Sequence, residues 1–385
     1  MTDNKFENRV FGAVLIKSVV ANYNADFTGS PRTLPNGVVY ATDKALKYCI
    51  RNYLKKEGEI IFYTTRYKRE NMQPLDIDET YIELFGEYPK IIKDFAKVDK
   101  NGKTNWQKEK EKNYNDFEIE KEGDGFVLLQ KDDKKVILID SDERKRKIIL
   151  QNLFKALDIR LFGATYASQE KVKINGKDQK ITFSVHGNVQ ITHGINIYPE
   201  NNIFTEDIVS PFRNSNEKSD NSQQTTIGNQ TVLEEGHYLH NFTINPKNSE
   251  DLVKLIDNQG YLTTEDIKKF KEAINKGVSY LDSASKIGVE NEFSIFVTLI
   301  KDAKIQLPSF TTLIKVEAQD NSFKRKLDLS ELKVVLNEDG IKDKIEKVEI
   351  YIDTTKLDYD DEIFGIEKVC VKSIVSDKEL KQCQK

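Results

Sequence analysis

The chain has 385 residues, with 59 Lys and Arg against 63 Asp and Glu, a net charge of -4 and 38% hydrophobic residues. This hydrophobic content is enough to build a core, which excludes a wholly disordered chain. No apolar run in the sequence approaches the roughly 20 residues of a membrane-spanning helix, and the mild acidity argues against a protein that coats nucleic acid over its whole surface.

The cysteines indicate the compartment. Cys49, Cys370 and Cys383 lie far apart, are odd in number and form no CxxC pair. This pattern favours reduced thiols, without a disulfide framework or a thiolate zinc site. The first residues also lack the pattern of a signal peptide. We therefore expect a cytoplasmic protein that has no cofactor and no contact with a membrane.

The first 67 residues predict one strand–helix–strand unit. Residues 9–19 alternate as a buried strand and are followed by a loop over 21–37 that is rich in Asn, Gly and Pro. A Thr-Asp pair then begins an amphipathic helix over 42–57, and residues 59–67 read as a second strand. Such a unit is close to half of a ferredoxin-like fold.

The middle of the chain is less uniform. Residues 68–143 are rich in Lys and Glu and predict a partly helical insertion without a core of its own. Helical periodicity resumes over 144–157. Strict alternation over 181–195 predicts one long strand with an apolar face and a polar face. The polar interval 199–232 predicts the long tip of a hairpin that returns as a strand over 237–245.

The last third completes the core. A helix is predicted over 264–285 and a strand over 292–300, and residues 303–385 add strand-like segments that pack on the core (332–336, 346–352 and 366–375). The expected fold class is therefore α+β. Its parts are a ferredoxin-like or RRM-like core in 1–67 and 144–302, a helical insertion in 68–143, a hairpin loop in 199–232 and C-terminal strands in 303–385.

The helix over 42–57 carries the clearest charge signal. Lys44, Lys47, Arg51 and Lys55 are spaced 3, 4 and 4 residues apart, so they share the face opposite the apolar stripe. Residues 30–56 hold six basic residues and one acidic residue, a local charge of +5. This stripe is either an ordinary solvated helix face or a track for two or three phosphates.

The loop before this helix is a second candidate contact. Its exposed amides, its Asn side chains and Arg32 are groups that bind phosphates and sugar hydroxyls without reading sequence; plain turn geometry is the alternative. The predicted strands carry no RRM signature of stacked aromatics. If RNA is bound, tracking of its backbone is therefore favoured over base recognition on the sheet.

All four histidines lie between 186 and 240. His186 and His193 would lie on opposite faces of one strand, as would His237 and His240, which argues against a metal site or an acid–base pair. We expect structural or RNA-contacting histidines. Asp26, in the loop, caps a turn or positions a metal or water for RNA cleavage; turn capping is the ordinary role.

Several segments carry a resemblance to a known family. They are Arg9-Val10-Phe11-Gly12 with Ile16-Lys17-Ser18, Asn22-Tyr23-Asn24-Ala25-Asp26, Pro31-Arg32, the helix from Thr42 to Tyr53, Asp158-Ile159-Arg160-Leu161-Phe162-Gly163-Ala164, and Val185-His186-Gly187-Asn188-Val189-Gln190-Ile191. Together they resemble the crRNA-binding backbone subunits of type I Cascade complexes, CRISPR-associated proteins of the RAMP superfamily, in the Csh-type (type I-B) branch.

The resemblance implies a palm, fingers in 68–143 and a thumb in 199–232. Copies of the subunit would stack head to tail on one CRISPR guide RNA, which pairs with target DNA. The capping, large and repeat-processing subunits of Cascade would be further partners. The implied RNA-binding residues are Lys44, Lys47 and Arg51 at guide phosphates, Asn22, Asn24, Arg32 and Arg160 along the same groove, His186, and Arg213 in the thumb.

Three functions remain open from the sequence. The leading interpretation is a non-catalytic, RNA-binding subunit of an antiviral surveillance complex. The rival is an RRM-fold CRISPR endoribonuclease that uses a histidine general base, His186 or His240. The third is a ferredoxin-like scaffold that binds protein alone.

Overall fold

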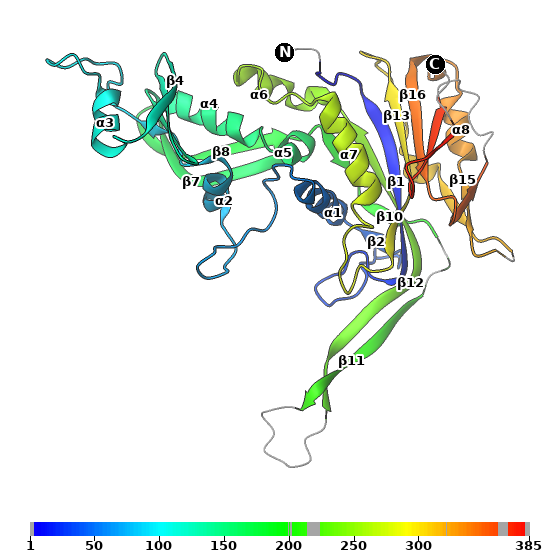
Figure 1. Cartoon of the computed structure of the whole chain (residues 1–385). Helices are drawn as coiled ribbons and strands as arrows, with labels where there is room; N and C mark the ends of the chain where they lie inside the picture. The colour runs from blue at the N-terminus through cyan, green and yellow to red at the C-terminus, as the bar shows by residue number, and fades with distance from the viewer. Residues whose placement is uncertain are drawn as a thin grey trace. The chain divides into compact units, whose positions relative to one another are not determined.

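The computed structural model describes residues 4–198, 200, 202–213, 224–320, 322–360 and 369–381. The fold is mixed α+β, as expected (Figure 1). The chain divides into two compact units. The first consists of residues up to Phe6, Glu57–Asn188 and Pro246–Asp266; the second consists of Glu7–Lys56, Val189–Asn245 and the chain from Ile267 onward.

The second unit is built on a sheet whose central strand is β1 (Val10–Ala21). β1 pairs antiparallel with β12 (Gln224–Ile244) on one side and with β13 (Val289–Leu299) on the other. β10 (Gly194–Asn196) pairs with β12, so the local order is β13-β1-β12-β10. The remaining strands of this sheet are β2 (Tyr40–Ala41), β9 (Val189–Ile191), β11 (Ile203–Arg213), β16 (Ile345–Ile352), β18 (Val369–Ser373) and β19 (Glu379–Lys381).

Two helices pack on one face of this sheet. α1 (Asp43–Lys56) buries its apolar stripe, as predicted, and α7 (Thr264–Lys276) places Phe270 against Phe242 of β12 with ring centroids 5.8 Å apart. Asn291 of β13 donates a hydrogen bond of 2.8 Å to the carbonyl of Ile274, which fixes the end of α7. The helix predicted over 264–285 is therefore shorter than expected.

The opposite face of the sheet is covered by the C-terminal part of the chain. Leu15, Leu239 and Phe293 point into a cluster that contains Phe310 and the buried side chains of α8 (Ser330–Leu336). A small sheet of β14 (Lys315–Glu317), β15 (Arg325–Asp328) and β17 (Leu357–Tyr359) adds to it. The strand predicted over 332–336 is wrong, because these residues lie in α8, where Leu332 and Leu336 are buried one helical turn apart.

The hairpin of β11 and β12 extends from the sheet as a two-stranded ribbon (Figure 1). Ile203 pairs with Leu233 at its base, and Arg213 pairs with Gln224 at the outer end of the described part. Much of the polar interval 199–232 is thus regular strand. Pairing across the ribbon satisfies the backbone hydrogen bonds that the sequence pattern left unassigned.

The first unit contains the insertion. Its helices are α2 (Ile77–Phe85) and α3 (Asn105–Asn113), each begun by a capping box. The same range also forms a four-stranded sheet, which the sequence did not predict: β3 (Lys90–Ile91), β4 (Glu118–Gly123), β5 (Phe126–Lys131) and β6 (Lys134–Ile139). Trp106 packs with Val127 and Leu138 there, so the insertion has a hydrophobic cluster of its own.

The remainder of the first unit joins helices to a two-stranded sheet. α4 (Asp142–Leu153), α5 (Leu157–Phe162) and α6 (Glu250–Leu255) accompany β7 (Gly163–Ile174) and β8 (Lys177–His186). Ile149, Leu153 and Ile181 lie in one buried cluster of this unit. The helical periodicity expected from residue 144 is confirmed by α4.

Two predicted strands are wrong. Residues 59–67 form an irregular segment with bends instead, because the Asp158 carboxylate accepts from the backbone N–H groups of Phe62 (2.8 Å) and Tyr63 (3.0 Å). The strand predicted over 181–195 is three strands, β8, β9 and β10. It is interrupted at Asn188, whose side chain is buried and donates to the Arg160 carbonyl and Ser249.

Candidate nucleic-acid interface

The exposed face of α1 is the best-defined basic surface of the second unit. The helix buries Leu46, Cys49, Ile50, Tyr53 and Leu54, so the residues between them face outward. Lys44 is exposed, and its ammonium has no ion pair within the described part of the chain. Tyr48 is 56% exposed and follows Lys44 by one helical turn. Sequence reasoning missed this tyrosine, although its spacing places it among the basic residues.

Lys47 is engaged within the helix. Its Nζ lies 2.9 Å from Oδ2 of Asp43, one turn earlier. Burial acts to raise the pKa of Asp43, but the hydrogen bond and charge of Lys47 outweigh it and lower the pKa below its ordinary value. Lys47 therefore reaches an RNA phosphate only in competition with Asp43. Arg51 is partly buried on the same side of the helix.

The loop before α1 is tied to the start of the helix by Asn24. Its Oδ1 accepts hydrogen bonds from the backbone N–H (2.9 Å) and the hydroxyl (3.0 Å) of Thr42. Arg32 closes the loop by donating from Nε to the carbonyl of Ala25 at 3.1 Å. These bonds hold Asn24 and Arg32 next to the helix N-terminus that carries Lys44, so the structure brings these three predicted residues into one surface region.

Asn22 has a structural position. It is 4% exposed, and its Nδ2 donates to the carbonyls of Gly29 (3.0 Å) and Thr231 (3.2 Å). It therefore fastens the loop to β12 instead of facing outward.

Asp26 caps the turn at the tip of the loop. Its Oδ1 accepts from the backbone N–H (2.8 Å) and the hydroxyl (2.7 Å) of Thr28 and from the N–H of Ser30 (3.1 Å). The hydrogen bond from the Thr28 hydroxyl is the main cause of its lowered pKa. This is the ordinary turn-capping geometry of aspartate.

Two of the four histidines are buried in the second unit. The ring of His240 bonds to two groups, the Thr192 carbonyl at 3.0 Å from Nδ1 and the Tyr23 hydroxyl at 3.3 Å from Nε2. Because a carbonyl only accepts, Nδ1 carries a proton. Burial lowers the pKa of His240 to about 4. His193 is 55% exposed, and its Nδ1 accepts from the N–H of Asp43.

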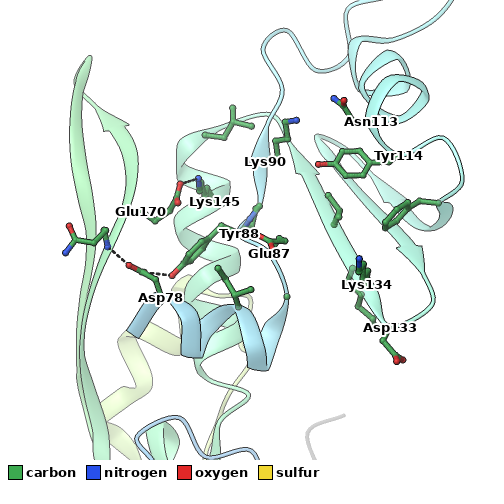
Figure 2. A pocket seen from close by; sticks show the side chains of 18 residues that line it. Asp78, Glu87, Tyr88, Lys90, Asn113, Tyr114, Asp133, Lys134, Lys145 and Glu170 are labelled. Atoms are coloured by element: carbon green, nitrogen blue, oxygen red, sulfur yellow. Dashed lines mark hydrogen bonds and ion pairs between the residues drawn. The ribbon is translucent and has the colours of Figure 1, made fainter. Parts of the chain in front are cut away.

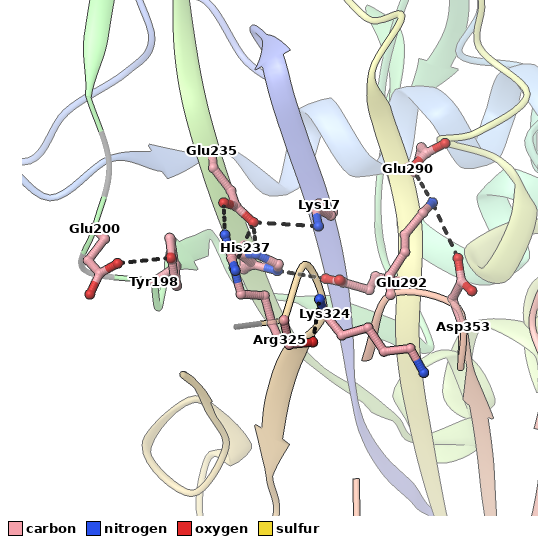
Figure 3. Close-up of polar contacts among 12 residues, drawn as sticks. Lys17, Tyr198, Glu200, Glu235, His237, Glu290, Glu292, Lys324, Arg325 and Asp353 are labelled. Carbon is pink, nitrogen blue, oxygen red and sulfur yellow. Dashed lines mark hydrogen bonds and ion pairs between the residues drawn. The ribbon is translucent and has the colours of Figure 1, made fainter. Parts of the chain in front are cut away.

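His237 lies in a buried network of charges (Figure 3). Its ring is fully buried and donates to Glu292 at 2.7 Å and to Glu235 at 3.1 Å. Burial acts to lower the pKa of His237, but the two carboxylates outweigh it and raise the pKa above its ordinary value. Arg325 of β15 and Lys17 of β1 add positive charge beside Glu235. The network joins three strands of the main sheet to the C-terminal sheet.

Arg160 and His186 belong to the first unit. The Arg160 guanidinium forms a two-pronged ion pair with Asp266, at 3.0 and 2.8 Å, and donates to the carbonyls of Phe154 and Lys155. His186 is exposed at the end of β8, opposite Gly163 in the β7–β8 register. Arg213 is the last residue of β11, which belongs to the second unit. The residues predicted to bind RNA are thus divided between the two units, with Arg160 and His186 in the first.

Two of the motif segments pack against each other in the first unit. A Cβ placed on Gly187 would lie 2.1 Å from the carbonyl carbon of Phe162, and one on Gly163 would lie 2.2 Å from the carbonyl oxygen of Val185. Only glycine permits this approach of the two backbones. The glycines of the two segments that begin at Asp158 and Val185 are therefore required for the packing of this part of the first unit.

Comparison with known protein families and with solved structures gives matches in both. The family model of the CRISPR-associated protein Cas7 matches residues 8–337. The chain belongs to the Cas7 family. Two solved structures, each described as a CRISPR RNA-guided surveillance complex, also match. One, in a pre-nicking state, has 13% identity, covers 95% of this chain and 97% of that chain, and has a TM-score of 0.48. The other has 11% identity, 94% coverage of both chains and a TM-score of 0.43. Comparison with curated proteins gives no match.

The first unit of this Cas7-family chain contains a cavity of about 1070 Å³, which is lined by residues of the insertion together with Lys145, Gln169 and Glu170 (Figure 2). Tyr88 lies at one side, stacked on Tyr81 with ring centroids 4.4 Å apart and bonded to Asp78 at 2.6 Å. Lys145 and Glu170 form an ion pair of 2.5 Å in its wall. None of the residues predicted to bind RNA lines this cavity.

Three further findings concern metal, membrane and thiols. Within the described ranges, no group of three or more His, Cys, Asp or Glu is arranged to hold a metal ion. Among the helices of that same part of the Cas7-family chain, none is both long and apolar enough to cross a membrane. Cys49 is free, and burial raises its pKa to about 11. Cys370 is disulfide-bonded, which corrects the expectation of reduced thiols throughout.

Proposed function

We propose that this chain is a non-catalytic, guide-RNA-binding backbone subunit of a type I-B CRISPR surveillance complex. Copies of it stack head to tail along the guide, which pairs with target DNA. The observation that carries this proposal is the exposed basic face of α1, held beside Arg32 by the bonds of Asn24. This surface offers phosphate contacts and no base-specific pocket, which suits a protein that must accept any guide sequence.

The covered sheet favours this mode of binding. In an RRM-like fold, RNA bases stack on the sheet face opposite the helices. Here that face is buried beneath Phe310 and α8, whereas the helix before which the loop lies presents Lys44 to solvent. The local charge of +5 over residues 30–56 supplies the attraction.

The strand order supports a ferredoxin-like palm. β13-β1-β12-β10, with α1 and α7 on one face, is the order that a βαββαβ unit gives when its fourth strand lies beside its first. We assign the insertion of the first unit to the fingers and the ribbon of β11 and β12 to the thumb. The head-to-tail contact between such subunits is heterologous, so it grows helically along a guide.

The endoribonuclease alternative is less well supported. A general base must reach the 2′-hydroxyl of its substrate, and both ring nitrogens of His240 and of His237 are already bonded in the interior. Of the histidines, His186 and His193 are the exposed ones. Asp26 is the one carboxylate of the loop over residues 21–37, and its Oδ1 is engaged in capping the turn.

The test is the binding of single-stranded RNA as a function of salt. Lys44→Glu, Lys47→Glu and Arg51→Glu together should weaken binding strongly and make it less dependent on salt, because each phosphate contact contributes a slope of about -0.7. A matched triple variant of exposed lysines in the same unit, Lys342→Glu, Lys344→Glu and Lys378→Glu, has the same change in charge and should bind RNA like the wild type.

The same samples are then run on a denaturing gel. Intact RNA is expected after long incubation with the wild type. RNA that is cut by the wild type, and left uncut by His186→Ala, would move the assignment to the endoribonuclease. If the two triple variants bind RNA equally well, α1 does not form part of the RNA-binding surface.

A further inference from the structure

Phe27 lies at the tip of the loop before α1, and its side chain is fully exposed, at 103% of the reference area. A single exposed apolar side chain is common on protein surfaces and carries no meaning by itself. The surroundings of Phe27 are less ordinary, because this ring is presented by a loop that is held at several points and lies beside a cation.

The loop is fixed on both sides of Phe27. Asp26 bonds to Thr28 and Ser30 across the turn, and Asn22 donates to the carbonyl of Gly29. Gly29 has a φ of +88°, a value that favours glycine and allows the tight return of the chain. An aromatic ring on such a loop loses little conformational freedom when it binds a ligand.

Arg32 accompanies the ring. Its guanidinium carbon lies 5.9 Å from the centroid of Phe27, while its Nε is bonded to the Ala25 carbonyl. The terminal nitrogens of Arg32 form no ion pair within the residues that the structure describes. An exposed aromatic face next to an available guanidinium is a pair that suits a nucleotide, since the ring stacks on the base and the cation meets the phosphate.

We propose that Phe27 is a stacking platform for one unstacked base of the bound RNA, with Arg32 at the adjoining phosphate. This inference rests on the proposed function and adds to it a contact with a base. Phenylalanine has no hydrogen-bonding group on its side chain, so the stack accepts any of the four bases. The contact therefore adds affinity without limiting which guide is bound.

The connection between the loop and α1 indicates the path of the RNA across this surface. Asn24 joins the loop to Thr42, immediately before α1, so Phe27, Arg32 and Lys44 belong to one continuous surface of the second unit. A strand whose phosphates follow α1 reaches the loop at the N-terminal end of the helix. The base at that point leaves the stack of its neighbours and packs on Phe27.

The experiment compares Phe27→Ala and Phe27→Trp with the wild type on two RNAs of equal length. One RNA carries all its bases, and the other is abasic throughout, so that it retains the sugar-phosphate chain alone. Both are too short to hold two copies of the protein. Phe323→Ala is the matched control, because Phe323 is 83% exposed in the same unit and precedes β15.

Phe27→Ala should bind the base-bearing RNA about 5- to 150-fold more weakly, the range expected for the loss of one stacked base. Its affinity for the abasic RNA should equal that of the wild type, and its salt slope should be unchanged, because no charge is altered. Phe27→Trp should retain binding, and Phe323→Ala should have no effect on either RNA.

Each other outcome overturns the inference in a distinct way. If the wild type binds RNA and Phe27→Ala binds it equally well, the stack does not exist, while the proposed function stands. If Phe27→Ala loses the same affinity for both RNAs, Phe27 acts on the loop and not on a base. If the short RNAs show no difference but longer guides recruit fewer copies of Phe27→Ala, the ring belongs to a contact between copies. Absence of all binding by the wild type overturns both proposals.

Discussion

The Nδ1 atom of His237 lies 2.7 Å from Oε2 of Glu292, and neither side chain is exposed to solvent. The other ring nitrogen bonds to Glu235, so the two carboxylates favour the protonated ring and raise the pKa of His237. Lys17 and Arg325 approach Glu235 from β1 and β15 and offset the second negative charge. A buried charge is tolerated when it is paired in this way, and the arrangement makes the stability of the second unit depend on pH.

The first prediction is a loss of stability as the pH rises above the ordinary histidine pKa of about 6.5. Because the pKa of His237 is raised in the folded state, its contribution is fully present below the unfolded value of about 6.5 and is lost as the pH rises through the folded pKa. The free energy of unfolding should fall across this window in urea titrations. His237→Gln should remove that fall, whereas the exposed control His193→Gln should retain it. Parallel profiles for the wild type and His237→Gln would contradict the prediction.

The second prediction concerns the acid side. The pKa of His240 is lowered to about 4 by burial, so the folded protein holds a neutral ring. Its contribution is present above a pH of about 6.5 and is lost as the pH falls toward 4, a change of about 3 kcal/mol at most. His240→Asn should be less stable at neutral pH but should lose stability less steeply on acidification through this window. An equal acid slope in both proteins would rule out His240 as its source.

The third prediction assigns Arg160 to structure. Its two-pronged pair with Asp266 is largely shielded from solvent, with 16% and 6% of the side chains exposed. Arg160→Ala should destabilise the first unit by about 3 kcal/mol, because Asp266 is left without its partner. Arg160→Lys retains the positive charge but cannot form the two-pronged pair with Asp266. If Arg160 also contacts a phosphate, this variant should keep most of the RNA binding that Arg160→Ala loses, but less of the lost stability. Equal stability of all three proteins in thermal unfolding would refute the structural role.

The fourth prediction tests the close packing at Gly12 of β1. A Cβ there would lie 2.2 Å from Cζ of Phe242 and 2.4 Å from the carbonyl oxygen of Ile295. Gly12→Ala should therefore cost about 3 kcal/mol of the free energy of unfolding, since the core cannot admit the methyl group without moving. Gly123→Ala is the control, because no atom lies within 4 Å of its Cβ position. Equal urea midpoints for the two variants would mean that Phe242 moves aside at little cost.

The fifth prediction concerns stacking along the guide. If copies bind head to tail, complexes assembled on guides of increasing length should gain mass in steps of one subunit, 44.4 kDa. Mass photometry measures these steps directly. Removal of the described ribbon, by joining Asn202 to Glu234 through a short turn, should leave binding to a short RNA unchanged and reduce the number of copies on a long one. A continuous mass distribution would argue against a fixed repeat of subunits.

The sequence was sufficient to predict those helices and strands whose buried residues recur at regular spacing along the chain. The apolar stripe of α1 reports burial on one face, and the continuous apolar runs of β1 and β13 report burial on both faces; both patterns are local. The basic face of α1 follows from the same periodicity. The prediction failed at residues 59–67, where β-branched and aromatic residues indicate a strand but Asp158, far along the chain, takes the backbone N–H groups of Phe62 and Tyr63.

Tertiary structure alone decided which polar groups are inside. No pattern in the sequence indicates that Glu292 is fully buried beside His237, because their meeting depends on the register of β1, β12 and β13. Sequence reasoning likewise assigns Asn22 and Arg160 to a surface, whereas the folded chain uses both to hold its own backbone. Periodicity records how often a residue faces the core, but the partner of a buried charge is set by strands that are distant in sequence and adjacent in space.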